Sequence, residues 1–385
     1  GFTQVKEAKE DTPLSDKIEG APHPSRTKKI FGQESASKEF LDLFTASRLH
    51  HAWLLYGPRG IGKATLAWQI TKFLLATPDL KLGSDSIKSK LEVPTTLEIS
   101  PDHPISKRIA VGSEPGVFVL RRAYDEKRKR FKQVITVDEV RKLKTFFGLK
   151  SADAGRRIII VDCADEMNAN AANALLKILE EPPKNAFLFL ISHQPARLLP
   201  TIRSRCRSMR LDRLDKTSVV KALDAANINF ETSQLDSLTK LCGGSIGEAL
   251  RILNMQGLQM YEEILEILKT VPRMNNKKVH VLANKFLGKG ASSEFELFIL
   301  LVETALNRLV LSSVGKETFE HIAAFEEPKV FKRLSPDQTA AKIWAELAQI
   351  TSERLRSGRA VNLDPTGLIL DTFFKIETCF LRFAK

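Results

Sequence analysis

Residues 30–210 of the chain alternate short apolar runs with stretches of helical periodicity. Runs of four to six apolar residues bounded by polar or turn residues predict strands that are buried on both faces of a sheet. Buried strands joined by helices form βαβ units, so we predict an α/β domain with a mostly parallel sheet. The predicted strands are Ala52–Tyr56, Val117–Leu120, Ile158–Val161 and Ala186–Ile191, and helices are predicted at Ala64–Leu75 and Asn170–Glu181.

The composition and hydrophobic pattern of the sequence change along the chain and divide it into four segments. Residues 1–28 are polar and almost free of large apolar side chains, so we predict a disordered tail before a sheet domain at residues 29–210. No convincing strand follows residue 211. Three short helical patterns predict a small helical lid at residues 211–271, and longer amphipathic patterns predict a larger helical domain at residues 272–385. These patterns are Ser218–Ala226, Ser233–Leu241, Ile246–Met255, Val279–Leu287, Glu294–Val314, Pro336–Ser357 and Thr366–Phe383.

Charge and cysteine content exclude several classes of protein. Lys and Arg outnumber Asp and Glu by 59 to 46, which favours nucleic acid or nucleotide phosphate as a binding partner but does not fix a function. The four cysteines are at least 36 residues apart, so we expect neither a local zinc site nor a disulfide framework. The longest apolar runs have about six residues, whereas a membrane span needs about 20. With no secretory leader pattern in view, we expect a cytoplasmic protein.

The strongest motif lies between the first predicted strand and the first predicted helix, which is the context of a phosphate-binding loop. Its glycines let backbone N–H groups turn toward phosphates, the helix N-terminus adds a positive dipole end, and Lys63 reaches the β and γ oxygens. The alternative interpretation is a glycine-rich turn with an incidental lysine. The predicted nucleotide-binding residues are Gly57, Gly60, Gly62, Lys63 and Thr65.

The residues that would hold magnesium depart from this pattern. Ala64 stands directly after the lysine, where a hydroxyl normally coordinates Mg²⁺. Asp162 follows a buried strand and suits a Mg²⁺ hydration shell, but Cys163 comes next where an ATPase of this type usually has a glutamate. Asp162 is therefore either a degenerate acidic motif or a carboxylate that merely caps the strand. We expect weak ATP binding with a compromised magnesium site, and no metal-binding residues.

A set of motifs in a fixed order resembles bacterial replicative clamp-loader subunits of the AAA+ superfamily. The resemblance runs from about residue 30 to the C-terminus and is strongest over residues 49–209. It implies a RecA-like P-loop domain, a helical lid and a helical collar that mediates oligomerisation. The motifs are Phe31-Gly32-Gln33, His50-His51-Ala52-Trp53, the phosphate loop, Ala174-Leu175-Leu176-Lys177-Ile178-Leu179-Glu180-Glu181-Pro182-Pro183 and Ser204-Arg205-Cys206.

The chain departs from the motor subunit of that family (gamma/tau) at three positions, and in this it resembles the delta-prime type. They are Ala64, Cys163 and, in the predicted lid, Gly247 where the motor has a sensing arginine. The resemblance implies a subunit of DNA polymerase III that does not itself hydrolyse ATP. Its implied partners are the gamma/tau and delta subunits and, through the complex, the sliding clamp and primed DNA. Residues 77–135 lack the cysteines of the family's zinc module, so we expect no zinc.

Arg205 is the predicted functional residue of this group. In the family, the arginine of the Ser-Arg-Cys motif points into the ATP site of the neighbouring subunit, and an arginine supplied in this way stabilises the charge of phosphoryl transfer. The alternative is one more surface arginine in a basic segment that also holds Arg203, Arg207, Arg210 and Arg213.

Two rival functions stay open on the sequence. One is a working AAA+ ATPase, either the clamp-loader motor or another DNA-dependent motor; the other is a stand-alone basic protein that binds nucleic acid. The basic run at residues 121–130 could contact DNA phosphates, but a solvated hairpin tip is the simpler interpretation. The last predicted helix could join other subunits or only close the core of its own domain.

Overall fold

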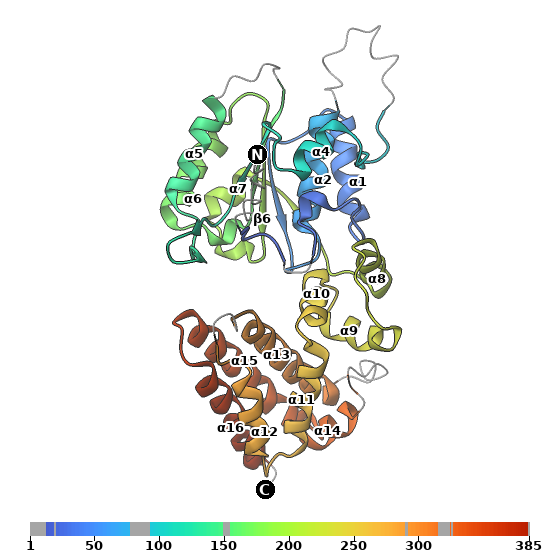
Figure 1. Ribbon diagram of the computed structural model, residues 1–385, viewed down its shortest axis with the longest axis vertical. Coiled ribbons are helices and arrows are strands. Elements are labelled where there is room, and N and C mark those ends of the chain that lie inside the picture. The colour runs from blue at the N-terminus through green and yellow to red at the C-terminus, as the bar shows by residue number, and fades with distance from the viewer. Residues whose placement is uncertain are drawn as a thin grey trace, which may run out of the picture. The chain divides into compact units, whose positions relative to one another are not determined.

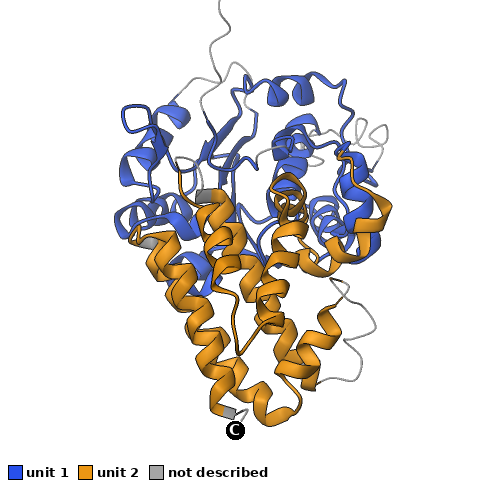
Figure 2. Ribbon diagram, turned by 60° about the horizontal axis from the view of Figure 1, so that its bottom comes forward, with its two compact units in different colours: residues 1–227 blue, residues 228–385 orange. Residues whose placement is uncertain are grey.

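The computed structural model of the protein describes residues 13–18, 21–77, 93–148, 155–288, 292–314, 324 and 326–383. These residues form two compact units, residues 1–227 and residues 228–385 (Figure 2). Unit 1 contains the sheet and unit 2 is helical in its described residues. The predicted fold class, a parallel-sheet α/β domain followed by helices, is confirmed. The finer boundaries near residues 210 and 271 stay predictions.

Unit 1 is built on a parallel five-stranded sheet with the strand order β2-β5-β6-β1-β7. Four of the strands occupy the four predicted apolar runs. The fifth strand was not predicted, because Met209 is the single buried residue among its four. It is an edge strand that pairs with β1 alone, and its arginines are exposed. The strands are β1 (Ala52–Tyr56), β2 (Val117–Leu120), β5 (Arg157–Val161), β6 (Ala186–Ser192) and β7 (Arg207–Arg210).

Helices cover both faces of this sheet, with α5 and α6 on one side and α1, α2 and α4 on the other (Figure 1). Alternate strand residues face the two layers. Leu54 and Ile159 pack in the core beneath α5 and α6, whereas Trp53 packs against Phe40 of α1 at 5.2 Å between ring centroids. The helices are α1 (Glu34–Thr45), α2 (Lys63–Ala76), α4 (Pro104–Ala110), α5 (Val137–Gly148), α6 (Ala169–Glu180), α7 (Pro200–Arg205) and α8 (Lys216–Ala225), with 3-10 turns η1 (Pro24–Arg26), η2 (Ala164–Glu166) and η3 (Pro195–Arg197).

The segment before the sheet corrects the prediction of a disordered tail. Residues 1–12 and 19–20 lie outside the described residues, but the rest of residues 1–28 is packed on unit 1. The ring of His23 is buried and meets Trp68 of α2 edge-on at 5.9 Å, and η1 follows directly. The prediction fails here because the segment is held by polar contacts and one ring contact rather than by large apolar side chains.

The basic run at residues 121–130 forms a short antiparallel hairpin. Its strands β3 (Tyr124–Asp125) and β4 (Arg130–Phe131) pair Tyr124 with Phe131, whose rings meet at 5.2 Å. The charged residues 126–130 between and beside them are exposed. The hairpin interpretation therefore accounts for the run, and contact of this run with DNA stays untested.

The first helix predicted after residue 211 is α8 of unit 1, and the other helices predicted after it lie in unit 2. The described residues of unit 2 also form α11 and α14, which were not predicted. The pattern of α11 was present, since Tyr261, Ile264, Leu265 and Leu268 recur at helical spacing and are buried. The elements are η4 (Thr232–Gln234), α9 (Leu235–Cys242), α10 (Ile246–Asn254), α11 (Gly257–Lys269), α12 (Asn276–Asn284), α13 (Ser292–Val314), α14 (Glu327–Leu334), α15 (Gln338–Ala360) and α16 (Pro365–Phe383).

Helix α13 is the central helix of unit 2. By length and composition Ser293–Val314 would suit a membrane, as the core helix of a globular domain also would. Its side chains Leu297, Phe298 and Leu309 are fully buried, and the helix packs against α11, α14 and α15. Its Arg308 donates to Glu327, which is itself fully buried and also accepts from Tyr261 at 2.6 Å. These contacts account for the apolar sequence of α13 as a protein core.

The last helix, α16, begins as its sequence predicts. Asp364 accepts a hydrogen bond from the N–H of Gly367 at 3.0 Å, and Pro365 occupies the first turn. Its apolar stripe, which includes Leu368 and Phe373, is buried within unit 2. The stripe therefore closes the unit's own core, while Phe374 on another face of the helix remains 65% exposed.

Candidate functional site

The phosphate loop connects the carboxyl end of β1 to the first turn of α2, as predicted. Gly57, Gly60 and Gly62 all have positive φ angles, of 148°, 74° and 102°. At Gly57 a Cβ atom would lie 2.2 Å from the carbonyl oxygen of Leu211, so only glycine fits there. The loop backbone is thus held in a form that ordinary side chains would strain.

Lys63 is folded into this loop. Its side chain is buried, and Nζ donates to the carbonyl oxygen of Gly57 at 2.7 Å and to that of Pro58. Burial lowers the pKa of Lys63 to about 8, although the neighbouring Asp162 acts in the opposite direction. The ammonium group therefore sits where phosphate oxygens could replace backbone carbonyls as its partners.

Asp162 lies at the carboxyl end of β5, beside the phosphate loop. Its N–H donates to the carbonyl oxygen of Leu120 of β2 at 2.9 Å, which fixes the backbone at the carboxyl ends of these two strands. Burial is the largest of the causes that raise the pKa of Asp162 to about 7, and the negative charges of Asp16 and Glu166 act in the same direction. At neutral pH the carboxyl group is therefore protonated in a large share of the molecules, which weakens it as a magnesium ligand.

Asp165 uses its carboxylate to join the ends of β5 and β6. It accepts hydrogen bonds from Ser192 Oγ at 2.5 Å, from the N–H of His193 at 2.6 Å and from Cys163 Sγ at 3.1 Å. Burial acts to raise its pKa, but these bonds hold the pKa below the ordinary value. The sequence analysis assigned no role to Asp165. Its structural role follows from a strand pairing that no local motif reveals.

Asp16, from the segment before η1, was missed by the sequence analysis. Its carboxylate accepts from Arg121 Nη1 at 2.7 and 2.9 Å and pairs with His23 Nε2 at 2.9 Å. Its side chain is 1% exposed, and Arg121 directly follows β2. The N-terminal segment thus brings a second carboxylate to the carboxyl ends of the strands, where Asp162 also lies.

The donor set at this edge fits phosphate better than magnesium. The loop offers backbone N–H groups, a helix N-terminus and Lys63, which together suit phosphate oxygens. Ala64 has no hydroxyl, and the pKa of Asp162 is about 7. In the part of the chain that the structure describes, no three His, Cys, Asp or Glu side chains gather in a manner that suits a metal ion.

Arg205 ends α7 and is held by two contacts within unit 1. Nη2 lies 2.7 Å from Oε1 of Glu180, the last residue of α6, and Nη1 donates to the carbonyl oxygen of Thr201 at 3.0 Å. The side chain remains 36% exposed. Ser204 donates to the same carbonyl oxygen at 3.0 Å, so the end of α7 presents the guanidinium group in one defined position.

Strand register places Arg205 far from the phosphate loop of its own chain. In the parallel pair of β1 and β7, Arg207 pairs with Trp53 near the start of β1, and Arg210 pairs with Tyr56 directly before the loop. Arg205 therefore lies at the amino edge of the sheet and the loop at the carboxyl edge. At about 3.3 Å per residue, the strands between them separate the two by more than about 10 Å.

The neighbouring arginines also pair with carboxylates of unit 1. Arg207 pairs with Glu39 at 3.0 Å and lies over the ring of Trp53, and Arg210 pairs with Asp212 at 3.0 Å. These contacts serve the edge strand β7. All three arginines pair with a carboxylate, so the sequence-based choice of Arg205 from this segment stays a prediction.

Gly247 lies in the first turn of α10 in unit 2. Ser245 caps this helix by accepting from the N–H of Glu248 at 3.1 Å, and Gly247 is buried within the unit. The position therefore provides no side chain that could contact a nucleotide.

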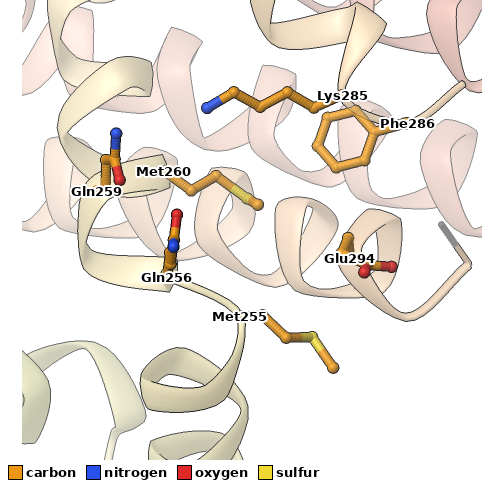
Figure 3. Close-up of a pocket in the computed structure, with 7 residues that line it drawn as sticks. All are labelled: Met255, Gln256, Gln259, Met260, Lys285, Phe286 and Glu294. Atoms are coloured by element: carbon orange, nitrogen blue, oxygen red, sulfur yellow. The ribbon is translucent and has the colours of Figure 1, made fainter.

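Unit 2 also contains a small hollow between α11, α12 and α13 (Figure 3). Its cavity volume is about 110 Å³, and Met260, Phe286 and Glu294 are among the side chains around it. Lys285 at its rim is paired with Glu263 at 2.6 Å. The hollow contains none of the residues that the sequence motifs singled out.

Comparison with known proteins finds similarity to subunits of DNA polymerase III. Residues 32–215 match the family described as "DNA polymerase III, delta subunit". The DNA polymerase III subunit delta' of Pseudomonas aeruginosa is 35% identical over 57% of this chain and 62% of its own length. The chain is thus similar to subunits of DNA polymerase III over the residues that form the sheet and the phosphate loop.

Gamma subunits of DNA polymerase III are also similar to the chain. The DNA polymerase III subunit gamma of Buchnera aphidicola is 26% identical over 69% of this chain and 68% of its own length. A gamma subunit-related protein of Thermotoga maritima, known from its crystal structure, is 16% identical with a TM-score of 0.37 over 89% of this chain and 99% of its own length. The chain spans about three fifths of the length of the Pseudomonas relative.

Proposed function

We propose that the chain is a delta-prime-type subunit of a replicative clamp loader that does not hydrolyse ATP. In this role it closes the ring of motor subunits and supplies Arg205 to the ATP site of a neighbour. The observation that carries the proposal is the position of Arg205 at the sheet edge opposite its own phosphate loop. An arginine so placed cannot reach its own nucleotide, but it is partly exposed and held ready for another subunit.

Three features support the absence of hydrolysis in this chain. Ala64 removes the hydroxyl ligand of magnesium, and Cys163 stands where a water-polarising glutamate is usual. Burial raises the pKa of the Cys163 thiol, so it stays protonated and cannot act as a base. Asp165, two residues after Cys163, is already occupied by hydrogen bonds from β6 and from Cys163.

The phosphate loop supports nucleotide binding without catalysis. Gly57, Gly60, Gly62, Lys63 and Thr65 would hold the phosphates of ATP, and binding would be weak because Lys63 must first leave its carbonyl partners. Binding would also depend little on magnesium. We propose no zinc for this chain.

The proposed partners are the gamma/tau and delta subunits, and through them the sliding clamp and primed DNA. The proposed location is the cytoplasm. The names of the similar proteins, DNA polymerase III subunits delta', gamma and tau, support an assembly of this kind.

The test is the ATPase activity of a reconstituted complex that contains the Arg205→Ala variant. We expect the variant to assemble normally, because a partly exposed arginine contributes little to its own fold. The clamp- and DNA-stimulated activity should fall by about tenfold or more, since such arginines supply factors of about 10³–10⁵. Arg203→Ala, on the same helix but exposed, is the matched control and should leave the activity unchanged. Unchanged activity with Arg205→Ala in an intact complex would contradict the proposal.

The rival function is a working motor, which the similarity to gamma subunits favours. The isolated chain with clamp and primed DNA distinguishes the two functions. A turnover number near the common enzyme median of about 10 s⁻¹ would establish the motor, whereas the proposed function predicts no turnover above background.

A further inference from the structure

A second basic pocket lies in unit 1, apart from the phosphate loop. It has a cavity volume of about 190 Å³ and is bounded by η1 and the residues after it, by α2, and by α4 with the residues before it. Lys72 and Gln69 of α2 line it, nine and six residues after Lys63. At about 1.5 Å per residue along the helix, Lys72 lies about 13 Å from the phosphate loop. The pocket is therefore a separate site.

The charged side chains around this pocket are all basic. Arg26, Lys28 and Lys72 line it, and none of its ten lining residues is acidic. Arg26 is fixed at the rim because its Nε donates to the carbonyl oxygen of Ala110 at 3.0 Å. The pocket thus concentrates positive charge with no carboxylate in its own wall.

Lys72 is poorly satisfied in this position. Among the described residues its ammonium group donates to the carbonyl oxygen of Thr27 at 3.5 Å, which is a long contact for an ammonium group. Burial lowers its pKa below the ordinary value. An ammonium group in such surroundings gains more from a bound anion than a solvated lysine does.

Two buried polar atoms in the same wall also lack partners. Ser106 is 6% exposed, and its Oγ makes no hydrogen bond within the described residues. The buried Oε1 atom of Gln69 is likewise without a donor, and rotation of the amide would turn an NH₂ group to the same place. Buried polar groups rarely remain unpaired, so a ligand that accepts from both side chains would complete the pocket.

We propose that this pocket binds an oxyanion of the phosphate class, held by Lys72, Arg26 and the hydroxyl of Ser106. The cavity is large enough for a phosphate group with its first substituent. Free phosphate and the backbone phosphate of a nucleic acid share this chemistry, and the experiment separates them. The proposal does not depend on hydrolysis or on Arg205, and it concerns a site that the phosphate loop does not share.

Amide hydrogen exchange of the full chain tests the proposal, because it reports on η1 and α4 separately from the phosphate loop. The probes are inorganic phosphate, sodium chloride at equal ionic strength, and a short single-stranded DNA. Phosphate at ten times its dissociation constant should slow exchange in peptides covering residues 21–28 and 104–110 by about tenfold if opening of these segments releases the anion. Chloride should not.

Variants assign the effect to the pocket. Lys72→Met and Ser106→Ala should each abolish most of the protection; Ser106→Ala removes an unpartnered hydroxyl, so it should not unfold the protein. The matched control is Lys142→Met on α5, since the side chain of Lys142 is 58% exposed; this variant should keep the protection by phosphate. Protection should also persist in Lys63→Met, because the phosphate loop is not its source.

The outcomes are decisive in each direction. Protection by phosphate that Ser106→Ala removes supports the site, and protection by the DNA as well identifies a backbone phosphate as a ligand. Equal protection by chloride, no protection by phosphate, loss of protection in Lys63→Met, or protection unaltered in both pocket variants would overturn the proposal.

Discussion

The raised pKa of Asp162 predicts that this residue makes folding depend on pH. Its pKa is about 7 in the folded protein against an ordinary value of 3.8, a difference of about 3 units. The folded state therefore holds the proton more tightly than the unfolded state does. Stability is lost as pH rises between about 4 and about 7, which is opposite in sign to the contribution of a salt-bridged carboxylate.

The magnitude follows from the same difference in pKa. At about 1.4 kcal/mol per unit, complete ionisation of Asp162 removes at most about 4 kcal/mol from the free energy of unfolding, and about 2–3 kcal/mol of this falls between pH 5 and pH 8. The side chain keeps partial contact with solvent, so we expect about 2 kcal/mol over this range. Lys63, with a pKa lowered to about 8, acts in the opposite sense, and stability rises as pH increases above that value.

Asp162→Asn isolates the contribution, since asparagine has the shape of the protonated acid and no charge. Unfolding by guanidinium in the presence of EDTA is followed by the fluorescence of Trp53 and Trp68 in a Trp344→Phe background, so that only unit 1 reports. The advantage of the variant over the parent should grow by about 2 kcal/mol from pH 5 to pH 8. Asp224→Asn, an exposed aspartate of α8, is the control and should show no such growth. A difference between Asp162→Asn and its parent that does not change with pH would refute the reasoning, and would mean that Asp162 is ionised and available to magnesium.

Three further predictions concern nucleotide, assembly and the support of Arg205. Calorimetry of ATP with the isolated chain should give weak binding that EDTA changes little, because Ala64 cannot coordinate magnesium; tight binding that EDTA abolishes would contradict this. Truncation after Asn227, at the boundary of the two compact units, should leave unit 1 folded by circular dichroism but unable to co-elute with gamma/tau, and co-elution at full affinity would exclude unit 2 as the main joint. Glu180→Gln removes the charged partner that lies 2.7 Å from Arg205, and a surface pair of this kind is worth about 0.2–1 kcal/mol. We therefore expect the ATPase of the complex to fall by a factor of about 1.4 to 5, with Glu181→Gln as the control and an equal effect of both variants as the contrary result.

Much of the fold could be predicted because its signals are local. Buried central strands must be apolar throughout, so β1, β2, β5 and β6 were visible as short runs. The phosphate loop was visible because the conformation of Gly57 requires glycine. The start of α16 was visible because an aspartate and a proline are the residues that begin a helix.

Other features depend on contacts between distant parts of the chain. The edge strand β7 has only one buried residue, so its pairing with β1 leaves little trace in the sequence. Asp16 meets Arg121 across 105 residues, and a polar segment gives no local sign of such a partner. Asp165 holds Ser192 across 27 residues for the same reason.

The sequence by itself determined the succession of the central strands and most helices along the chain, the phosphate loop and the missing hydrolytic residues, because each is a property of adjacent amino acids. Only the tertiary structure decided where Arg205 lies, since the parallel register of β7 on β1 carries it to the edge away from the phosphate loop. It also decided that Asp162 has a pKa of about 7, because that value comes from burial and from the charges of Asp16 and Glu166, which folding brings together. Local chemistry can be read from neighbouring residues, whereas burial and charge depend on every element packed around a group.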